Sequence, residues 1–530
     1  MEIIPAKMDE SAVENFLGSS RTLWIVSIVT IVLFLVTNLP WTLDEYDQAK
    51  QAFTSFEMIK EGHWLYQLTP NGRVATKPPL VGWVSAGLFA VTRSWGAAWR
   101  LPSLFAAIAI SLLLFNAAKI AYGRAAGLIA LSAFSLNLLS PRLAMLVRTD
   151  MPLALVVFAL GLQIWSKVGK GAAWTRRDRI LFFLLLTAAT LIKGPIVYAF
   201  LLPGIVIFQW RARRTVAAGT AWPGWWPWIA SLAIFLLWVA GGIFFVPDFY
   251  NQVVVREFAA RFSQTIHRPH PSYYYIPHLL QKFAPWSVLI VALAALFFRR
   301  AKVKFVQALK EISPQMVWLM CWCAGGIFVM SVIPSKRVDR IFPVIPPLCL
   351  LLAAQVGGIK QDKSSAHRTL QWSAISMILA LLFIGEYVVA KVVKEYHHRG
   401  LAVFGRTVRQ QAAAEGLHYE IVGRRSSGSG KGGQTAESSK KRRKTIRPES
   451  VATQLRYKDG VLLLYLERTH FMSIDDGIAG WNSGALDSLV APESEWPRLA
   501  HELRNVAATP RLTAATNRGV RYIFISHGSG

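Results

Sequence analysis

Long apolar runs recur along the chain from near its N-terminus to about residue 390. Each is long enough, or nearly so, to cross the roughly 30 Å of hydrocarbon in a bilayer. The runs lie at 22–39, 102–118, 125–140, 151–166, 180–192, 195–210, 228–246, 278–298, 315–333, 341–357 and 371–390. We therefore predict a multi-pass α-helical membrane protein with about 11 to 13 spans, in which the two runs flanking Lys193 are either separate spans or one broken element.

The composition excludes most soluble proteins. Hydrophobic residues make up 53% of the 530 residues and charged residues only 17%, with 20 tryptophans. A soluble enzyme of this length exposes more charge and alternates apolar with polar faces. The bilayer is therefore predicted to be the main solvent. No small-residue cleavage pattern follows the first apolar run, so this run is predicted to be a retained anchor.

The basic residues indicate an orientation in the membrane. The formal net charge is +28, which by itself could also indicate a nucleic-acid-binding protein. Most of the excess lies in every second connection between the apolar runs, as in cytoplasmic loops, and in the C-terminal tail. With the N-terminus inside, the segments predicted to face outside are 40–101, 141–150, 247–277, 334–340 and 391–530. Nucleic acid is not needed to explain the charge, and no nucleic-acid partner is predicted.

The tail is predicted to form a separate domain. We divide the chain into a transmembrane core, 1–390, with an exterior loop at 40–101, and a small C-terminal extracytoplasmic α/β domain, 391–530. Strand-like pieces at 419–422, 461–466 and 522–526 and a helix at 493–504 support this domain. The insert 424–447 is basic and rich in Gly and Ser, so it is predicted to stay disordered and solvated, or to touch anionic lipid headgroups.

An acidic segment follows the first apolar run. Thr42 and Glu45 have the spacing of a capping box, which predicts a helix from Thr42 with Asp44 in its first turn. Tyr46, Ala49, Phe53 and Phe56 then form an apolar stripe that would lie on the membrane surface before the helix ends at Gly62. In this interpretation the carboxylate of Asp44 lies at the outer end of the helix bundle. The alternative is that the acidic residues only mark the start of an ordinary helix.

Further charged residues occur at bends on the predicted outer side. Ionisable groups at the edge of a bilayer are costly unless they are paired or functional. Each Lys or Arg could instead have no functional role and only extend its charged end to the lipid headgroups. Together they indicate a site for a phosphate-bearing substrate. These residues are Lys77, Arg148, Asp150, Lys193, Arg256, Arg261, His267, Arg268, Lys336, Arg337 and Arg340.

Several motifs resemble those of the polyprenyl-phosphate-dependent glycosyltransferases with the C-type membrane fold (GT-C). The closest groups are the aminoarabinose (lipid A) transferases and the protein O-mannosyltransferase-like proteins. The motifs are Asp44-Glu45, Lys77-Pro78-Pro79, Arg148-Thr149-Asp150-Met151-Pro152, Lys193-Gly194-Pro195, His267-Arg268-Pro269 with Tyr273-Tyr274-Tyr275, Pro285-Trp286-Ser287, and Ser335-Lys336 leading to Pro343. Thr76, Asp47 and Arg340 depart from the aminoarabinose pattern, which leaves the sugar open.

The resemblance implies a function. A sugar carried on a polyprenyl (undecaprenyl) phosphate would pass to lipid A, another glycolipid or glycan, or a protein at the periplasmic face of a bacterial cytoplasmic (inner) membrane. The implied partners are this donor, that acceptor and membrane lipids. The implied catalytic residues are Asp44 as the base, with Glu45 or Asp150 orienting the acceptor or positioning a metal. The implied donor phosphate-binding residues are Lys77, Lys193, Arg261, Arg268 and Lys336.

No cofactor is firmly predicted, although a divalent cation stays open. His267 and His270 are three residues apart, but no third ligand follows at a diagnostic spacing. Cys321, Cys323 and Cys349 lie within predicted spans and form no metal motif. The alternative functions are a polyprenyl-lipid or sugar transporter or flippase without transferase activity, and a noncatalytic envelope scaffold.

Overall fold

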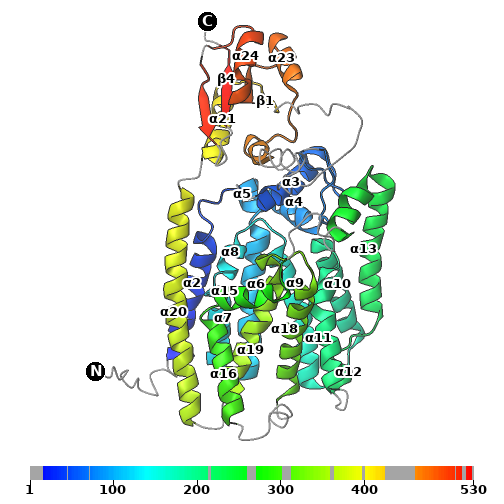
Figure 1. Cartoon of the computed structure of the whole chain (residues 1–530), viewed down its shortest axis with the longest axis vertical. Helices are drawn as coiled ribbons and strands as arrows, with labels where there is room; N and C mark the ends of the chain where they lie inside the picture. Colours follow the sequence, from blue (N-terminus) through cyan, green and yellow to red (C-terminus); the bar gives the residue numbers. More distant parts are fainter. Residues whose placement is uncertain are drawn as a thin grey trace, which may run out of the picture. The chain divides into compact units, whose positions relative to one another are not determined.

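A computed structural model describes most of the chain (Figure 1). The described residues are 16–43, 46–70, 72–212, 217–259, 270–300, 312–358, 363–396, 400–423, 460–507, 509–515 and 521–527. They divide into two compact units. The first comprises residues 1–39, 64–66 and 74–393, and the second comprises residues 40–63, 67–73 and 394–530. The predicted domains, 1–390 and 391–530, stay a prediction, and the second unit also includes most of 40–73, which that prediction gave to the core.

The first unit is built almost entirely from helices. They are α2 (Ser20–Val36), α4 (Leu80–Thr92), α5 (Trp95–Ala98), α6 (Leu101–Tyr122), α7 (Arg124–Ser135), α8 (Ser140–Ala144), α9 (Asp150–Lys170), α10 (Arg176–Lys193), α11 (Ile196–Ala212), α12 (Ala217–Thr220), α13 (Trp226–Phe245), η1 (Tyr250–Ala259), η2 (Ser272–Tyr274), α15 (Tyr275–Lys282), α16 (Trp286–Arg300), α18 (Pro314–Val332), η3 (Val338–Val344), α19 (Ile345–Gly358) and α20 (Lys363–Tyr396).

Six stretches among the described residues are long and apolar enough to cross a membrane. They are Leu101–Tyr122, Asp150–Lys170, Trp226–Phe245, Pro314–Val332, Val338–Gly357 and His367–Glu395, and shorter apolar helices occur at Ser20–Val36, Leu80–Thr92, Arg124–Ser135 and Ile196–Ala212. Figure 1 shows α6, α9, α18 and α19 running side by side in the centre of this unit, where they contact one another. The prediction of a multi-pass helical membrane protein is confirmed.

One predicted span is broken. The run 278–298 was predicted to be continuous, but α15 and α16 meet at an angle of 101° and count together as at most one further span. Pro285 lies at the break, and proline cannot donate the backbone hydrogen bond that a continuous helix requires. The other suspected break is present at the predicted place. α10 ends at Lys193, and Gly194 has φ +77°, a value that favours glycine, before α11 begins at Ile196.

Small residues allow α11 and α18 to approach closely. A β-carbon at Gly325 would lie 2.5 Å from the backbone nitrogen of Gly204, and one at Gly204 would lie 2.8 Å from the Cα of Trp322. Membrane helices commonly use glycine in this way, because the apolar solvent provides little drive for association and close packing has to supply it. The indoles of Trp318 and Trp322 are fully buried beside this contact and stack with centroids 5.8 Å apart.

The second unit contains a four-stranded sheet in the order β1-β2-β4-β3. The strands are β1 (Tyr419–Ile421), β2 (Ser488–Pro492), β3 (Leu512–Ala515) and β4 (Arg521–Ser526). β1 pairs with β2 in parallel, and the other pairs are antiparallel. Its helices include α3 (Tyr46–Glu61), α21 (Gly400–Glu415), α23 (Ile474–Asn482), η4 (Glu493–Glu495) and α24 (Trp496–Glu502).

Most of the predicted elements of this unit are present. The strands predicted at 419–422 and 522–526 and the helix predicted at 493–504 correspond to β1, β4 and η4 with α24. The strand predicted at 461–466 is wrong, because residues 460–466 are helical. A short apolar run such as Val461–Leu466 does not distinguish a strand from a buried helix by periodicity, and these residues are almost completely buried. The insert 424–447 lies outside the described residues.

The acidic segment differs from its prediction in two respects. Thr42 and Leu43 are not helical, and α3 is described from Tyr46, so the predicted start at Thr42 is wrong. The apolar stripe does not lie on a membrane surface, because Ala49, Phe53 and Phe56 are between 0% and 4% exposed. Because the stripe is buried within the protein, α3 is a packed helix of a folded unit.

Candidate functional site

Two helix ends of the first unit meet at an ion pair. Asp150 is the first residue of α9 and Lys193 the last residue of α10, and the Lys193 ammonium donates to a carboxylate oxygen of Asp150. An acid at a helix N-terminus and a base at a C-terminus are both favoured by the helix dipoles. Both side chains are about nine-tenths buried, which makes this pair a fixed feature of the bundle.

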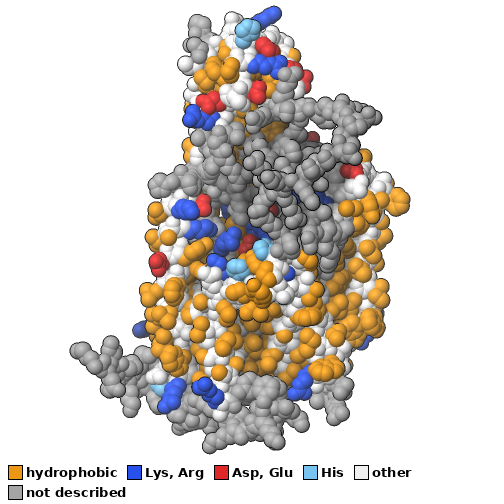
Figure 2. All heavy atoms as spheres, in the orientation of Figure 1, with side chains coloured by type: hydrophobic (Ala, Val, Ile, Leu, Met, Phe, Trp, Pro, Cys, Tyr) orange, Lys and Arg blue, Asp and Glu red, His pale blue; other side chains and the backbone are white. Residues whose placement is uncertain are grey.

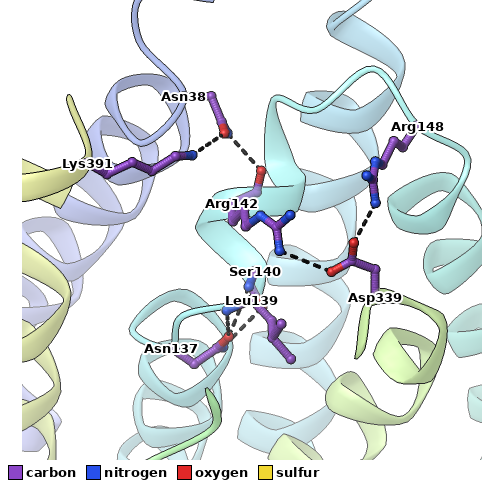
Figure 3. Close-up of polar contacts among 8 residues, drawn as sticks. All are labelled: Asn38, Asn137, Leu139, Ser140, Arg142, Arg148, Asp339 and Lys391. Carbon is purple, nitrogen blue, oxygen red and sulfur yellow. Dashed lines mark hydrogen bonds and ion pairs between the residues drawn. The ribbon is translucent and has the colours of Figure 1, made fainter. Parts of the chain in front are cut away.

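A second acid holds two arginines. Asp339, in η3, accepts one hydrogen bond from Nη1 of Arg142, in α8, at 3.2 Å and another from Nη1 of Arg148, just before α9. Figure 3 shows both guanidinium groups pointing at the one carboxylate. Arg148 and Arg337 also interact electrostatically with Asp150, so the two ion-pair groups adjoin.

The segment that runs from the end of α18 into η3 adds three more cations. Lys336 donates through Nζ to the carbonyl of His270 at 3.0 Å, and burial lowers the pKa of its ammonium. Arg340 donates through Nη1 to the carbonyl of Ser335 at 2.6 Å and to its Oγ at 3.0 Å. These bonds shape a loop that carries Lys336, Arg337 and Arg340 next to Asp339.

We refer to these side chains as the cation cluster. It contains six cations and, among the residues described there, two acids: Arg142, Arg148, Lys193, Lys336, Arg337 and Arg340 with Asp150 and Asp339. Both acids are already paired with cations, so the cluster keeps a net positive charge. Figure 2 shows Lys, Arg and His side chains gathered in a hollow at the edge of the hydrophobic surface of the helical unit. Such a site attracts an anionic headgroup.

Aromatic side chains adjoin the cluster. The ring of Tyr274 lies between the imidazoles of His270 and His278, with centroid distances of 4.6 and 4.4 Å. Tyr275 is fully buried, whereas Tyr273 is 64% exposed. These ring contacts lie at the start of α15, and the amine of Lys336 donates to the backbone carbonyl of His270.

The predicted site residues have different outcomes. Asp150, Lys193 and Lys336 lie in the cation cluster, and Lys77 is half-buried in the segment before α4. Asp44, Glu45, Arg261 and Arg268 lie outside the described residues. The roles given to all eight stay predictions. In the segments that the structure describes, no group of three or more His, Cys, Asp and Glu side chains is arranged to hold a metal ion.

Two members of the cluster were missed. Asp339 and Arg142 are 197 residues apart in the sequence. The one available signal for Asp339 was an acid inside a basic segment, Ser335-Lys336-Arg337-Val338-Asp339-Arg340, on the predicted outer side. Arg142 gave none, because a lone Arg at a helix end commonly serves to reach lipid headgroups.

The comparison with solved structures defines the class of fold. ArnT from Cupriavidus metallidurans bound to undecaprenyl phosphate superposes with a TM-score of 0.64 at 17% sequence identity, over 97% of this chain and 99% of that one. The apo state of the same protein superposes with a TM-score of 0.57, also at 17% sequence identity. The chain is therefore a multi-pass α-helical membrane protein with the GT-C fold, which confirms the fold expected from its motifs.

The chain is also similar to curated proteins that share one enzyme name. The undecaprenyl phosphate-alpha-4-amino-4-deoxy-L-arabinose arabinosyl transferase of Photorhabdus laumondii is 25% identical over 346 residues, which are 62% of this chain and 57% of that protein. The enzyme of the same name from Shewanella sediminis is 24% identical over 371 residues, 68% and 65% of the two chains. The chain thus spans about three-fifths of the length of these relatives. No family model matches it.

Proposed function

We propose that this protein is an integral-membrane glycosyltransferase that moves a sugar from a polyprenyl phosphate to an envelope acceptor such as lipid A, another glycolipid or glycan, or a protein. The observation that carries the proposal is the cation cluster, a partly buried and positively charged site where the ends of several helices meet in a GT-C fold. The names of the relatives and the ligand of the solved ArnT structure support the same donor class.

The chemistry requires a base and an anion-binding group. The acceptor hydroxyl oxygen forms a bond to the anomeric carbon of the sugar while the bond from that carbon to the phosphate oxygen breaks. The hydroxyl proton passes to Asp44, and the electron pair of the broken bond stays on the leaving polyprenyl phosphate. Cations stabilise the charge that develops on that phosphate, and each such electrostatic partner commonly contributes about 3 kcal/mol to the transition state.

The proposal assigns a role to each of the predicted site residues. Lys193 and Lys336, in the cation cluster, bind the donor phosphate together with Lys77, Arg261 and Arg268. Asp150 holds Lys193 and orients the acceptor, with Glu45 next to the base. The ion pair between Asp150 and Lys193 supports this assignment, because it holds a largely buried amine in place.

The lipid tail of the donor explains where the site lies. Extracting a polyprenyl chain from the bilayer costs about 0.8 kcal/mol per CH₂, so the sugar has to be handled where headgroups meet water. A cluster of cations at the ends of apolar helices suits that position. By the distribution of basic residues, this face and the C-terminal domain are extracytoplasmic, in a bacterial inner membrane.

A donor-panel assay tests the proposal. The purified protein, in detergent or vesicles, is incubated with a set of radiolabelled polyprenyl-phosphate sugars and an envelope lipid extract. Release of free polyprenyl phosphate together with a labelled acceptor is the expected result for one class of sugar. A transporter would move label across the vesicle membrane and leave the donor intact, and a scaffold would bind without either change. Either of those outcomes would contradict the proposal.

A further inference from the structure

Asp339 joins two arginines from separate parts of the chain. Its Oδ1 accepts from Arg142 of α8, and its Oδ2 accepts from Arg148, just before α9 (Figure 3). A carboxylate bridging two guanidinium groups fixes the distance and direction between them, because each bond is charge-assisted and directional. Without it, the like charges of Arg142 and Arg148 would repel each other.

The three side chains of Arg148, Asp339 and Arg142 differ in how deeply they are buried. The side chains of Arg148 and Asp339 are 6% and 9% exposed, whereas that of Arg142 is 31% exposed. A buried charge is costly unless it is paired, and Asp339 supplies a hydrogen-bonded carboxylate to the guanidinium of Arg148. Arg142 is the most exposed of the three side chains. The group therefore extends from the interior of the bundle to its surface.

The backbone of Arg142 is held independently. The Asn38 amide, just after α2, donates to the carbonyls of Arg142 at 2.8 Å and Pro141 at 3.3 Å, and its Oδ1 accepts from Nζ of Lys391 in α20 at 2.9 Å. At the other end of α8, Asn137 caps the turn by accepting from the backbone nitrogens of Leu139 and Ser140 (Figure 3). A guanidinium on so constrained a turn has few alternative positions.

The charge of Asp339 is unfavourable for an anion site if only the sum of charges counts. A carboxylate lowers the local positive charge and should weaken the binding of a phosphate. The presence of Asp339 in the cluster is explained if fixed positions of the arginine donors matter more for anion binding than the total charge. Prearranged donors lose less conformational entropy when they bind an anion than flexible ones do.

We propose that Asp339 is a positioning residue, which holds Arg142 and Arg148 as a rigid pair that binds the phosphate of a polyprenyl phosphate. This inference rests on the proposed function for the identity of the ligand. It adds to that function an acid that never contacts the sugar and that strengthens anion binding through two arginines.

Lipid binding tests the inference separately from transfer. The probes are undecaprenyl phosphate and undecaprenol, which lacks the phosphate, and the affinity of the purified protein is measured for each. Wild type should prefer the phosphate. Asp339→Asn should bind undecaprenyl phosphate roughly tenfold more weakly, as expected for a lost charge-assisted interaction, with undecaprenol binding unchanged. Asp339→Glu, which keeps the charge, should recover part of the loss.

The two explanations predict opposite changes in the affinity for undecaprenyl phosphate. If only the total charge mattered, Asp339→Asn would bind the phosphate more tightly, so equal or tighter binding would overturn the inference. Asp178→Asn removes an acid paired with Lys167 at the far end of α10 and should leave both affinities unchanged. If Asp339→Asn does not fold, Arg142→Lys keeps the charge but lacks the guanidinium fork, and unchanged phosphate affinity there would equally refute the inference.

Failure of the proposed function would look different. A wild-type protein that binds undecaprenyl phosphate in preference to undecaprenol, but transfers no sugar from any donor, would refute the transferase and leave Asp339 to be judged on binding alone. A wild-type protein without that preference would overturn the role of Asp339 directly.

Discussion

The ammonium of Lys193, at the end of α10, is paired with the carboxylate of Asp150, at the start of α9. The two residues are 43 positions apart, and each is about nine-tenths buried. The pair links the break at Gly194 to the first turn of a long apolar helix. The same contact therefore contributes to the packing of the bundle and to the charge of the proposed donor site.

A double-mutant cycle measures this link. Lys193→Ala and Asp150→Asn should each destabilise the protein by about 3 kcal/mol, because each leaves a buried charge without its partner. The double variant should lose less than the sum, with a coupling of roughly 0.5–3 kcal/mol. Denaturant unfolding in detergent gives these values. Additive losses would show that the contact is energetically unimportant. Lys193→Ala should also raise the KM for the donor, and an unchanged KM would count against its phosphate role.

Asp44 is predicted to be the base. Asp44→Asn should lower transfer about 100-fold or more at normal expression, since general base catalysis commonly contributes that much. Donor affinity should change little, because the cations bind the phosphate. Glu61→Gln, at the end of α3, is the matched control and should retain activity. Full activity of the Asp44 variant would remove Asp44 from this role.

The contact of α11 with α18 predicts a sharp difference between two glycines. Gly325→Ala would place a methyl group against the backbone of Gly204 and should cost about 1–3 kcal/mol of stability. A β-carbon added at Gly385, in α20, would have no atom within 4 Å, so Gly385→Ala should be neutral or slightly stabilising. Thermal unfolding of the two variants provides the measurement. Equal stability would mean that the helices do not pack this closely.

The start of α10 predicts a pH effect. Asp178 and Thr175 form a capping box, and the hydrogen bond from Lys167 is the main cause that lowers the pKa of Asp178 to about 2. Because the folded pKa lies below the ordinary value of 3.8, the stabilisation is present above pH 3.8 and is lost as the pH falls toward 2. Asp178→Asn should cost about 1 kcal/mol at pH 7 and progressively less in acid. A difference that does not depend on pH would contradict this assignment.

Much of the fold could be predicted from the sequence because bilayer crossing imposes long apolar runs. Lys193-Gly194-Pro195 also predicted a helix break that is present, since glycine and proline disfavour a continuous helix there. Val461–Leu466 was misassigned, because six apolar residues fit either a strand or a buried helix. The stripe of α3 was placed on the membrane because an amphipathic pattern does not say what covers its apolar face.

The candidate site was harder to predict than the fold. Asp150, Lys193 and Lys336 could be selected because charges at the ends of apolar runs are unusual. Their partners could not, because Asp339 meets Arg142 and Arg148 only through tertiary packing. An acid that positions other side chains leaves no spacing pattern in the sequence, whereas a helix cap such as Thr175 and Asp178 does.

We propose that the protein transfers a sugar from a lipid carrier to an envelope molecule. Mass spectrometry of envelope glycolipids and glycoproteins, from cells with and without the chain, tests it most directly. We predict that one class of molecule gains the mass of a single sugar residue only when the wild-type chain is present. Identical mass profiles in the two strains, under conditions where the donor is made, would contradict the account.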